Sequence, residues 1–184
     1  MFFLDISLGS VTIPFKEVYN SMTGSHASKS TWEYIIVNYR LPKAITAMLV
    51  GIGLSVSGLL MQTLFRNPLA GPDVLGLSSG AILAVAIVIL GAGFLPSFLN
   101  SILLSPYAIV LASTMGSILV LLLVLLVAQR LRNTMAILIV GLMFGSFTTA
   151  IVSVLTYFST AEQLQKFTFW SMGSLGNLSW STIG

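Results

Sequence analysis

Four long apolar runs leave little choice about what this chain can fold into. None contains Asp, Glu, Lys or Arg, and as helices rising 1.5 Å per residue each is long enough to cross the roughly 30 Å hydrocarbon core of a bilayer. The runs lie at residues 44–65, 74–95, 102–128 and 135–158. In lipid the backbone must satisfy its own hydrogen bonds, which helices do. The sequence therefore predicts an all-α, polytopic transmembrane helical bundle with four full spans.

The composition supports this class and excludes others. Hydrophobic residues make up 56% of the 184 residues and charged residues 7%, against about 25% charged in a typical soluble domain. The net charge of +3 is too small to indicate binding to nucleic acid. The absence of cysteine excludes disulfides, thiolate metal sites and cysteine nucleophiles.

Polar segments connect and flank the apolar runs. The connections at 66–73, 96–101 and 129–134 are short, so consecutive helices should be antiparallel neighbours. We expect residues 1–43 to form an interfacial segment. The stretch 159–184 should form another, because its tryptophans are typical of a membrane interface. The chain stops at Gly184 without a terminating element, so we expect it to be part of a longer protein.

Small residues recur at the spacing that allows helices to pack closely. Without a hydrophobic force between helices in lipid, association depends on close backbone approach, which such residues permit. Simple bundle packing is the commoner explanation, and some of these residues could also thin the wall of a passage. The pairs are Gly51 and Ser55, Gly76 and Gly80, Ala112 and Gly116, and Gly141 and Gly145.

The connection between the first two runs has the residues of a capped hairpin at the membrane surface. Arg66 follows the end of a helix, where a cation suits the negative end of the helix dipole. Asn67 can cap the next turn, with Pro68 at its first helical position. Asp73 stands near the positive N-terminus expected for the run at 74–95.

Enzyme functions find little support in the residues. The sequence has no G-x-x-x-x-G-K-[ST] phosphate-binding loop, so any ATP hydrolysis belongs to another subunit. The lone histidine, His26, lies in a polar stretch and is better explained as a solvated residue than as a metal ligand. No acid or histidine lies inside a run, which argues against an intramembrane protease or a proton-coupled carrier. No cofactor or metal site is expected.

Several longer motifs resemble one family. The sequence RLPK at residues 40–43 is followed by LVGIGLSVSGLLMQTLFRNPLAGPDVLGLSSGA, and later by LIVGLMFGSFTTAIVSVLTYFST and FWSMGSLGNLSW. These motifs resemble the FecCD-type permeases of bacterial ABC importers, which carry iron–siderophores, haem and cobalamin. The resemblance covers most of residues 7–180, and the run RNPLA-x-P-x-x-LG-x-SSGA is long and specific.

The resemblance implies a setting and partners. Members have about ten spans per subunit, work as homodimers in the bacterial inner membrane, and bind two cytoplasmic ATP-binding subunits and a periplasmic substrate-binding protein. This chain would correspond to spans two to five, with residues 1–43 and 159–184 on the periplasmic side. The hairpin of Arg66, Asn67, Pro68 and Asp73 would then be cytoplasmic. Charge counts alone leave the orientation open, because the hairpin side has three cations and the other side five.

The resemblance also implies roles for particular residues. Arg40 and Lys43 would pair with acidic residues of the docking binding protein, although both could simply be interfacial anchors. The cytoplasmic gate would include Asn133, Thr134 and Met135. The wall of the substrate path, at a homodimer interface, would contain Gly141, Gly145, Ser146, Thr148 and Thr149.

The predicted function is thus the membrane-spanning permease subunit of an ATP-driven importer for iron–siderophore, haem or cobalamin-type chelates. Two alternatives from other classes stay open at this point. The chain could be half of a secondary carrier built on repeats, or a membrane scaffold subunit that does not transport.

Overall fold

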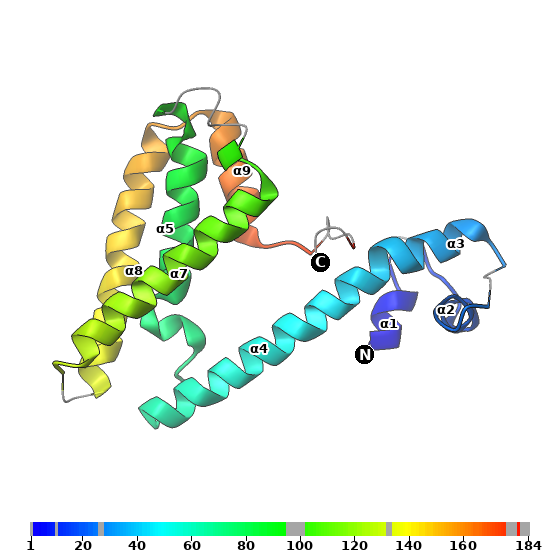
Figure 1. Ribbon diagram of the computed structural model, residues 1–184, viewed down its shortest axis with the longest axis horizontal. Helices are drawn as coiled ribbons and strands as arrows, with labels where there is room; N and C mark the ends of the chain where they lie inside the picture. The colour runs from blue at the N-terminus through cyan, green and yellow to red at the C-terminus, as the bar shows by residue number, and fades with distance from the viewer. Residues whose placement is uncertain are drawn as a thin grey trace. The chain divides into compact units, whose positions relative to one another are not determined.

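The computed structural model describes residues 2–9, 11–25, 28–94, 102–131, 134–175 and 180, and every regular element in these ranges is helical (Figure 1). The expected class of an all-α bundle is therefore confirmed. Two compact units divide the chain, and each is treated by itself below: residues 1–56 with 174–184, and residues 57–173. His26 and Asn133 lie outside the described residues.

The first unit folds around a small apolar core from short helices. Its fully or nearly fully buried members are Ile6, Ile13, Val18, Ile36 and Ala44. A polar contact links residues 17 and 28: the Glu17 carboxylate accepts hydrogen bonds from the Ser28 hydroxyl (2.5 Å) and amide (2.8 Å). These bonds lower the pKa of Glu17 below its ordinary 4.5. The elements are α1 (Phe2–Ser7), α2 (Phe15–Met22), α3 (Ser30–Ile35) and the π-helical turn η1 (Ile36–Arg40).

Helix α4 (Leu41–Phe65) follows the π-turn without a break. With α3 and η1 it forms a continuous helical stretch of 36 residues, Ser30–Phe65, whose apolar part is long enough to cross a membrane. Helix α4 thus begins three residues before the apolar run expected at residue 44. It includes Lys43, and Arg40 is the last residue of the π-turn before it.

The second unit is a bundle in which one short helix is surrounded by three others. Helix α5 (Leu77–Leu90) packs against α7 (Pro106–Ala128), α8 (Thr134–Tyr157) and α9 (Ala161–Met172) (Figure 1). Its buried side chains Val85, Ala86, Ile89 and Leu90 form a core with Phe167 of α9. The hydroxyl of Ser117 on α7 also donates to the Leu77 carbonyl oxygen of α5 at 3.1 Å.

The run at 74–95 differs from the uniform span that the sequence predicts. The structure divides it into the 3₁₀ turn η2 (Pro72–Leu75), α5 of 14 residues, and the 3₁₀ turn η3 (Gly91–Phe94). Gly76, at φ 74°, separates η2 from α5. Irregular backbone is tolerated at membrane depth where protein rather than lipid covers it. In the described part of the chain three helical stretches reach span length: Ser30–Phe65, Pro106–Ala128 and Met135–Tyr157.

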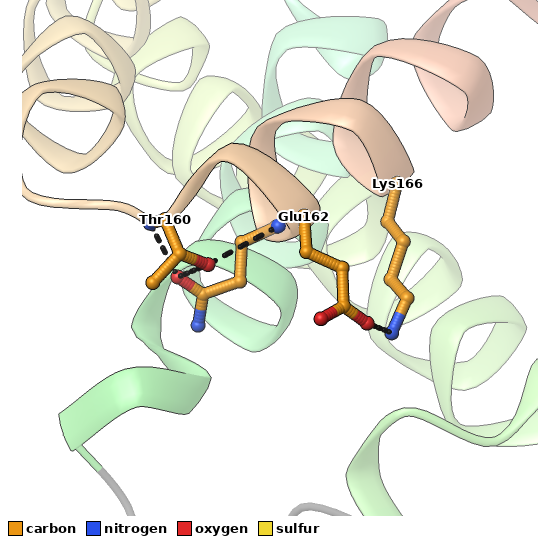
Figure 2. A network of polar contacts seen from close by, with 4 residues as sticks. Thr160, Glu162 and Lys166 are labelled. Carbon is orange, nitrogen blue, oxygen red and sulfur yellow. Dashed lines mark hydrogen bonds and ion pairs between the residues drawn. The ribbon is translucent and has the colours of Figure 1, made fainter.

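Helix α9 occupies part of the expected C-terminal interfacial segment, and its start is well capped (Figure 2). The Thr160 hydroxyl accepts from the Gln163 amide at 3.4 Å, while the Gln163 side-chain oxygen accepts from the Thr160 amide at 3.0 Å. This reciprocal arrangement is a capping box. One turn further, Lys166 pairs with Glu162 at 2.8 Å, and this contact lowers the pKa of Glu162.

Candidate functional site

Three of the five predicted path residues on α8 face the segment that contains η2 and α5. A Cβ atom built on Gly141 would lie 2.9 Å from the Leu75 Cα and closer still to the Val74 carbonyl oxygen, so the two backbones touch here. A Cβ built on Gly145 would lie 3.4 Å from the Ser79 hydroxyl. Thr148 is only 4% exposed. These residues therefore form the contact between α8 and the segment containing η2 and α5.

The other two path residues begin an accessible row of hydroxyls along α8. Ser146 and Thr149 are exposed, and Ser153 and Thr156 continue the row at intervals of three and four residues. Each hydroxyl donates to a carbonyl of its own helix, at 3.2 Å for Ser146, 2.9 Å for Thr149 and 2.8 Å for the other two. The row is therefore weakly polar, with acceptor lone pairs still available. The sequence analysis did not include Ser153 and Thr156, although their spacing from Thr149 could have identified them.

A groove of about 290 Å³ runs beside this row, between α5, α8 and α9. Hydroxyl groups and apolar side chains line it, and none of its described lining residues is charged. Such a surface offers only weak hydrogen bonding. The lining residues are Ser79, Ile82, Thr148, Thr149, Val152, Ser153, Thr156, Phe167 and Ser171.

The predicted gate residues lie where α8 begins. Thr134 is the first residue of the helix, and Met135 is 53% exposed. Asn133 is outside the described residues. The structure thus describes only those predicted gate residues that belong to α8.

The hairpin that connects α4 to η2 is held by side-chain hydrogen bonds. The Asn67 side chain accepts from the Leu69 amide at 2.9 Å and caps a turn that the Ala70 amide closes on the Asn67 carbonyl at 3.1 Å. Arg66 is exposed with a left-handed φ of 47°. Asp73 accepts from the Ser78 hydroxyl. Asp73 therefore lies in η2 and not at the start of a regular helix. Helix α5 begins at Leu77, three residues after the start of the apolar run at 74–95.

Arg40 and Lys43 share a cavity of about 360 Å³ in the first unit. The Arg40 guanidinium donates to the backbone carbonyls of Ile6 (2.6 Å), Ser7 (3.1 Å) and Val11. Lys43 is exposed and has no hydrogen-bond or ion-pair partner among the described residues. Arg40 and Lys43, which the sequence analysis gave the same role, therefore differ: the Arg40 guanidinium is hydrogen-bonded to the backbone, and the Lys43 ammonium group is not.

Metal binding has no visible basis in the part of the chain that the structure describes. Within it, no three His, Cys, Asp or Glu side chains come close enough to hold an ion together.

The described helices define an all-helical protein with span-length apolar helices and a weakly polar groove. Residues 1–184 match the FecCD transport family. The chain therefore belongs to the FecCD transport family, which the sequence motifs predicted.

Individual relatives agree with this assignment. The chain is 37% identical over 178 residues to the hemin transport system permease protein HmuU of Yersinia pestis, covering 96% of this chain and 50% of that protein. It is 36% identical over 149 residues to the vitamin B12 import system permease protein BtuC of Escherichia coli, covering 80% and 43% respectively. The chain thus spans about half the length of the curated relatives it matches.

One solved structure resembles the fold across nearly the whole chain. It is an inward-facing ABC transporter assigned to the metal-chelate type, with a TM-score of 0.76 and 27% sequence identity. The match covers 98% of this chain and 51% of that one.

Proposed function

We propose that this chain forms part of the membrane-spanning permease subunit of a bacterial ABC importer for metal chelates of the iron–siderophore, haem or cobalamin type. The observation that carries the proposal is the likeness, over nearly the whole chain, to an ABC transporter assigned to the metal-chelate type. Relatives named for hemin transport and vitamin B12 import point the same way.

The complete transporter would be assembled from the subunits typical of such ABC importers. A second copy of the permease would complete the translocation path, separate cytoplasmic ATP-binding subunits would hydrolyse ATP, and a periplasmic binding protein would deliver the chelate. The bacterial inner membrane would then hold the hairpin of Arg66, Asn67, Pro68 and Asp73 at the cytoplasmic side. Arg40 and Lys43 would lie at the periplasmic side.

The path would run along the hydroxyl row of α8. Ser146 and Thr149 would present its surface, extended by Ser153, while Gly141, Gly145 and Thr148 would hold α8 against the segment that contains η2 and α5. A passage for large and chemically varied cargo works best with weak contacts. The hydroxyls along α8 are already bonded to their own helix, which suits this requirement.

Uptake by the complete transporter tests the proposal. Proteoliposomes containing the permease and its ATP-binding subunits, supplied with the co-isolated binding protein, should accumulate at least one of haemin, cyanocobalamin or a ferric hydroxamate when ATP is enclosed. Uptake driven by an ion gradient without ATP would favour a secondary carrier. The lack of ATP-dependent uptake for all three chelates would contradict the proposed cargo class.

Matched substitutions on α8 test the path itself. Thr149→Phe and Ser153→Phe should reduce uptake about tenfold or more, because each ring would obstruct the hydroxyl row. Val154→Phe is the control, since Val154 is 58% exposed and lies on another face of the same helix. Equal uptake by all three variants, at equal amounts of assembled transporter, would exclude this face as the path.

A further inference from the structure

Two hydroxyl groups between α5 and α8 differ from their neighbours in their hydrogen bonding. Ser146, Thr149 and Ser153 each donate to a carbonyl oxygen of α8 itself. The hydroxyls of Ser79 and Thr148 have no hydrogen-bond partner within the part of the chain that the structure describes. Thr148 is only 4% exposed, and Ser79 is partly buried. Because a buried hydroxyl without a partner is destabilising, native structures usually supply one from the protein or from ordered water.

The backbone around η2 accounts for the Ser79 hydroxyl. A serine within a helix often donates to the carbonyl four residues before it, which for Ser79 is the carbonyl of Leu75. Leu75 belongs to the 3₁₀ turn η2, and Gly76, at φ 74°, separates this turn from α5. The hydrogen-bond ladder of α5 starts after Leu75, since the Gly80 amide donates to the Gly76 carbonyl at 3.0 Å. The usual acceptor for Ser79 therefore lies outside its own helix.

Ser79 and Thr148 lie on the facing surfaces of α5 and α8. A Cβ built on Gly145 would lie 3.4 Å from the Ser79 hydroxyl oxygen, so this hydroxyl lies against α8. Thr148 follows Gly145 by three residues and therefore lies on the same face of α8, one turn along. Both hydroxyl residues line the groove of about 290 Å³ between α5, α8 and α9. The two hydroxyls without partners thus border one space.

The lining of this groove favours a small neutral ligand that both donates and accepts hydrogen bonds. None of its described lining residues is charged, so a bound ion would have no counter-charge there. The Ser171 hydroxyl donates to the Thr168 carbonyl at 2.9 Å and still has lone pairs that can accept. A water molecule needs roughly 10–15 Å³ and about two to four polar partners. The groove provides both.

We propose that Ser79 and Thr148 together hold an ordered water molecule that joins α5 to α8. The water completes the hydrogen bonding of both hydroxyls inside an apolar bundle. It also connects the two helices where their side chains do not bond directly. This role does not depend on the cargo or on the proposed function, because it follows from the contact between α5 and α8 alone.

A double-mutant cycle, measured by denaturant titration of the purified protein, tests the shared water. Thr148→Val replaces the hydroxyl by a methyl group of similar size. It should raise the unfolding equilibrium constant about fivefold or more, because the water and Ser79 lose a partner. Ser79→Ala should act in the same direction. The double variant should be little worse than the larger single change, since each variant loses the same water.

The control for this cycle is Thr114→Val on α7. The Thr114 hydroxyl is exposed and donates to the Val110 carbonyl of its own helix at 2.8 Å, so its removal should change stability little. If Thr148→Val left stability unchanged or raised it, the proposal would be overturned, because a methyl group would then suit the site better than a hydroxyl. Additive losses in the double variant would overturn it as well, since the two hydroxyls would act separately.

X-ray footprinting detects the water itself, because the radiation forms hydroxyl radicals from bound water as well as from bulk solvent. After rapid mixing with heavy-oxygen water, a ring beside a held water should take up the heavy isotope later than a ring in contact with bulk solvent. Phe167 lines the groove and is 8% exposed, whereas Phe169 on the same helix is 63% exposed. The delay at Phe167 relative to Phe169 is expected in the wild type.

Two substitutions at position 148 separate the hydroxyl from its packing in the footprinting experiment. Thr148→Ser keeps the hydroxyl and should keep the delay at Phe167, even though it removes a methyl group. Thr148→Val fills the same volume without the hydroxyl and should abolish the delay. Equal incorporation at Phe167 and Phe169 in the wild-type protein would show that no water is held there and would overturn the proposal.

Discussion

The glycines of α5, α7 and α8 contrast with those of α4, although both groups follow similar sequence patterns. Gly80 and Gly116 meet across α5 and α7, where a Cβ on either would intrude on the backbone of the other helix. Gly51, Gly53 and Gly58 on α4 have no described atom within 4 Å of such a Cβ. The same residue type thus marks a close contact between α5 and α7, while the α4 glycines have no described atom close to them.

This difference shows what small residues contribute in an apolar chain. They permit close approach, but the contact needs a partner of suitable shape. Helix α5 meets α7 and α8 in the described chain, whereas no described atom lies within 4 Å of a Cβ built on the three α4 glycines. Substitution by alanine measures the contrast directly, because it adds one methyl group and little else.

The largest effect is expected where α5 crosses α7. Gly80→Ala should lower the free energy of unfolding by about 3 kcal/mol, since the new methyl would press on Gly116 backbone atoms that cannot rotate away. Gly116→Ala should behave alike, because its methyl would lie 2.6 Å from Ala84 Cβ. Denaturant titration of the purified protein in detergent measures both. A loss below 0.5 kcal/mol (a rough threshold) for either variant would contradict the close contact.

A smaller loss is expected where α8 meets η2. Gly141→Ala should reduce stability by about 2 kcal/mol, because its methyl would contact the backbone of Leu75. The turn can yield more readily than a helix, so the effect should be smaller than at Gly80. The matched control is Gly145→Ala on the same helix, whose methyl would lie 3.4 Å from the Ser79 hydroxyl and should change little. Equal losses at the two positions would contradict the closer contact of Gly141.

The turn before α5 gives a third comparison, because Gly76 combines close packing with unusual backbone geometry. Its φ of 74° is disfavoured for residues with a Cβ by about 1–2 kcal/mol. Gly76→Ala should therefore reduce stability by about 1.5 kcal/mol, in the same titration. Gly24→Ala is the control, since Gly24 has a φ of 79° with no atom nearby and isolates the backbone contribution. A larger loss at Gly76 than at Gly24 would measure the added contact with Gly141.

The sequence predicted some of these features and missed others for physical reasons. Runs without charge identified the helical membrane class, and the small-residue pairs that include Gly80 and Gly141 identified positions that pack closely. The interruption at Gly76 was missed, because an apolar run continues through it without a change of composition. The Arg40 contacts were also missed, since backbone carbonyl acceptors are common to all residues and leave no mark in a sequence. The roles of the path, gate and docking residues stay predictions.

The smallest effect is expected on α4. Gly51→Ala and Gly58→Ala should leave the stability of this chain unchanged or raise it by up to about 1 kcal/mol, because alanine favours a helix more than glycine does. The same variants should then be compared in the complete transporter, by thermal unfolding of the assembled complex. A loss of stability that appears only there would mean that another part of the assembly covers this surface. A loss in the isolated chain as large as that of Gly80→Ala would remove the contrast between the two regions.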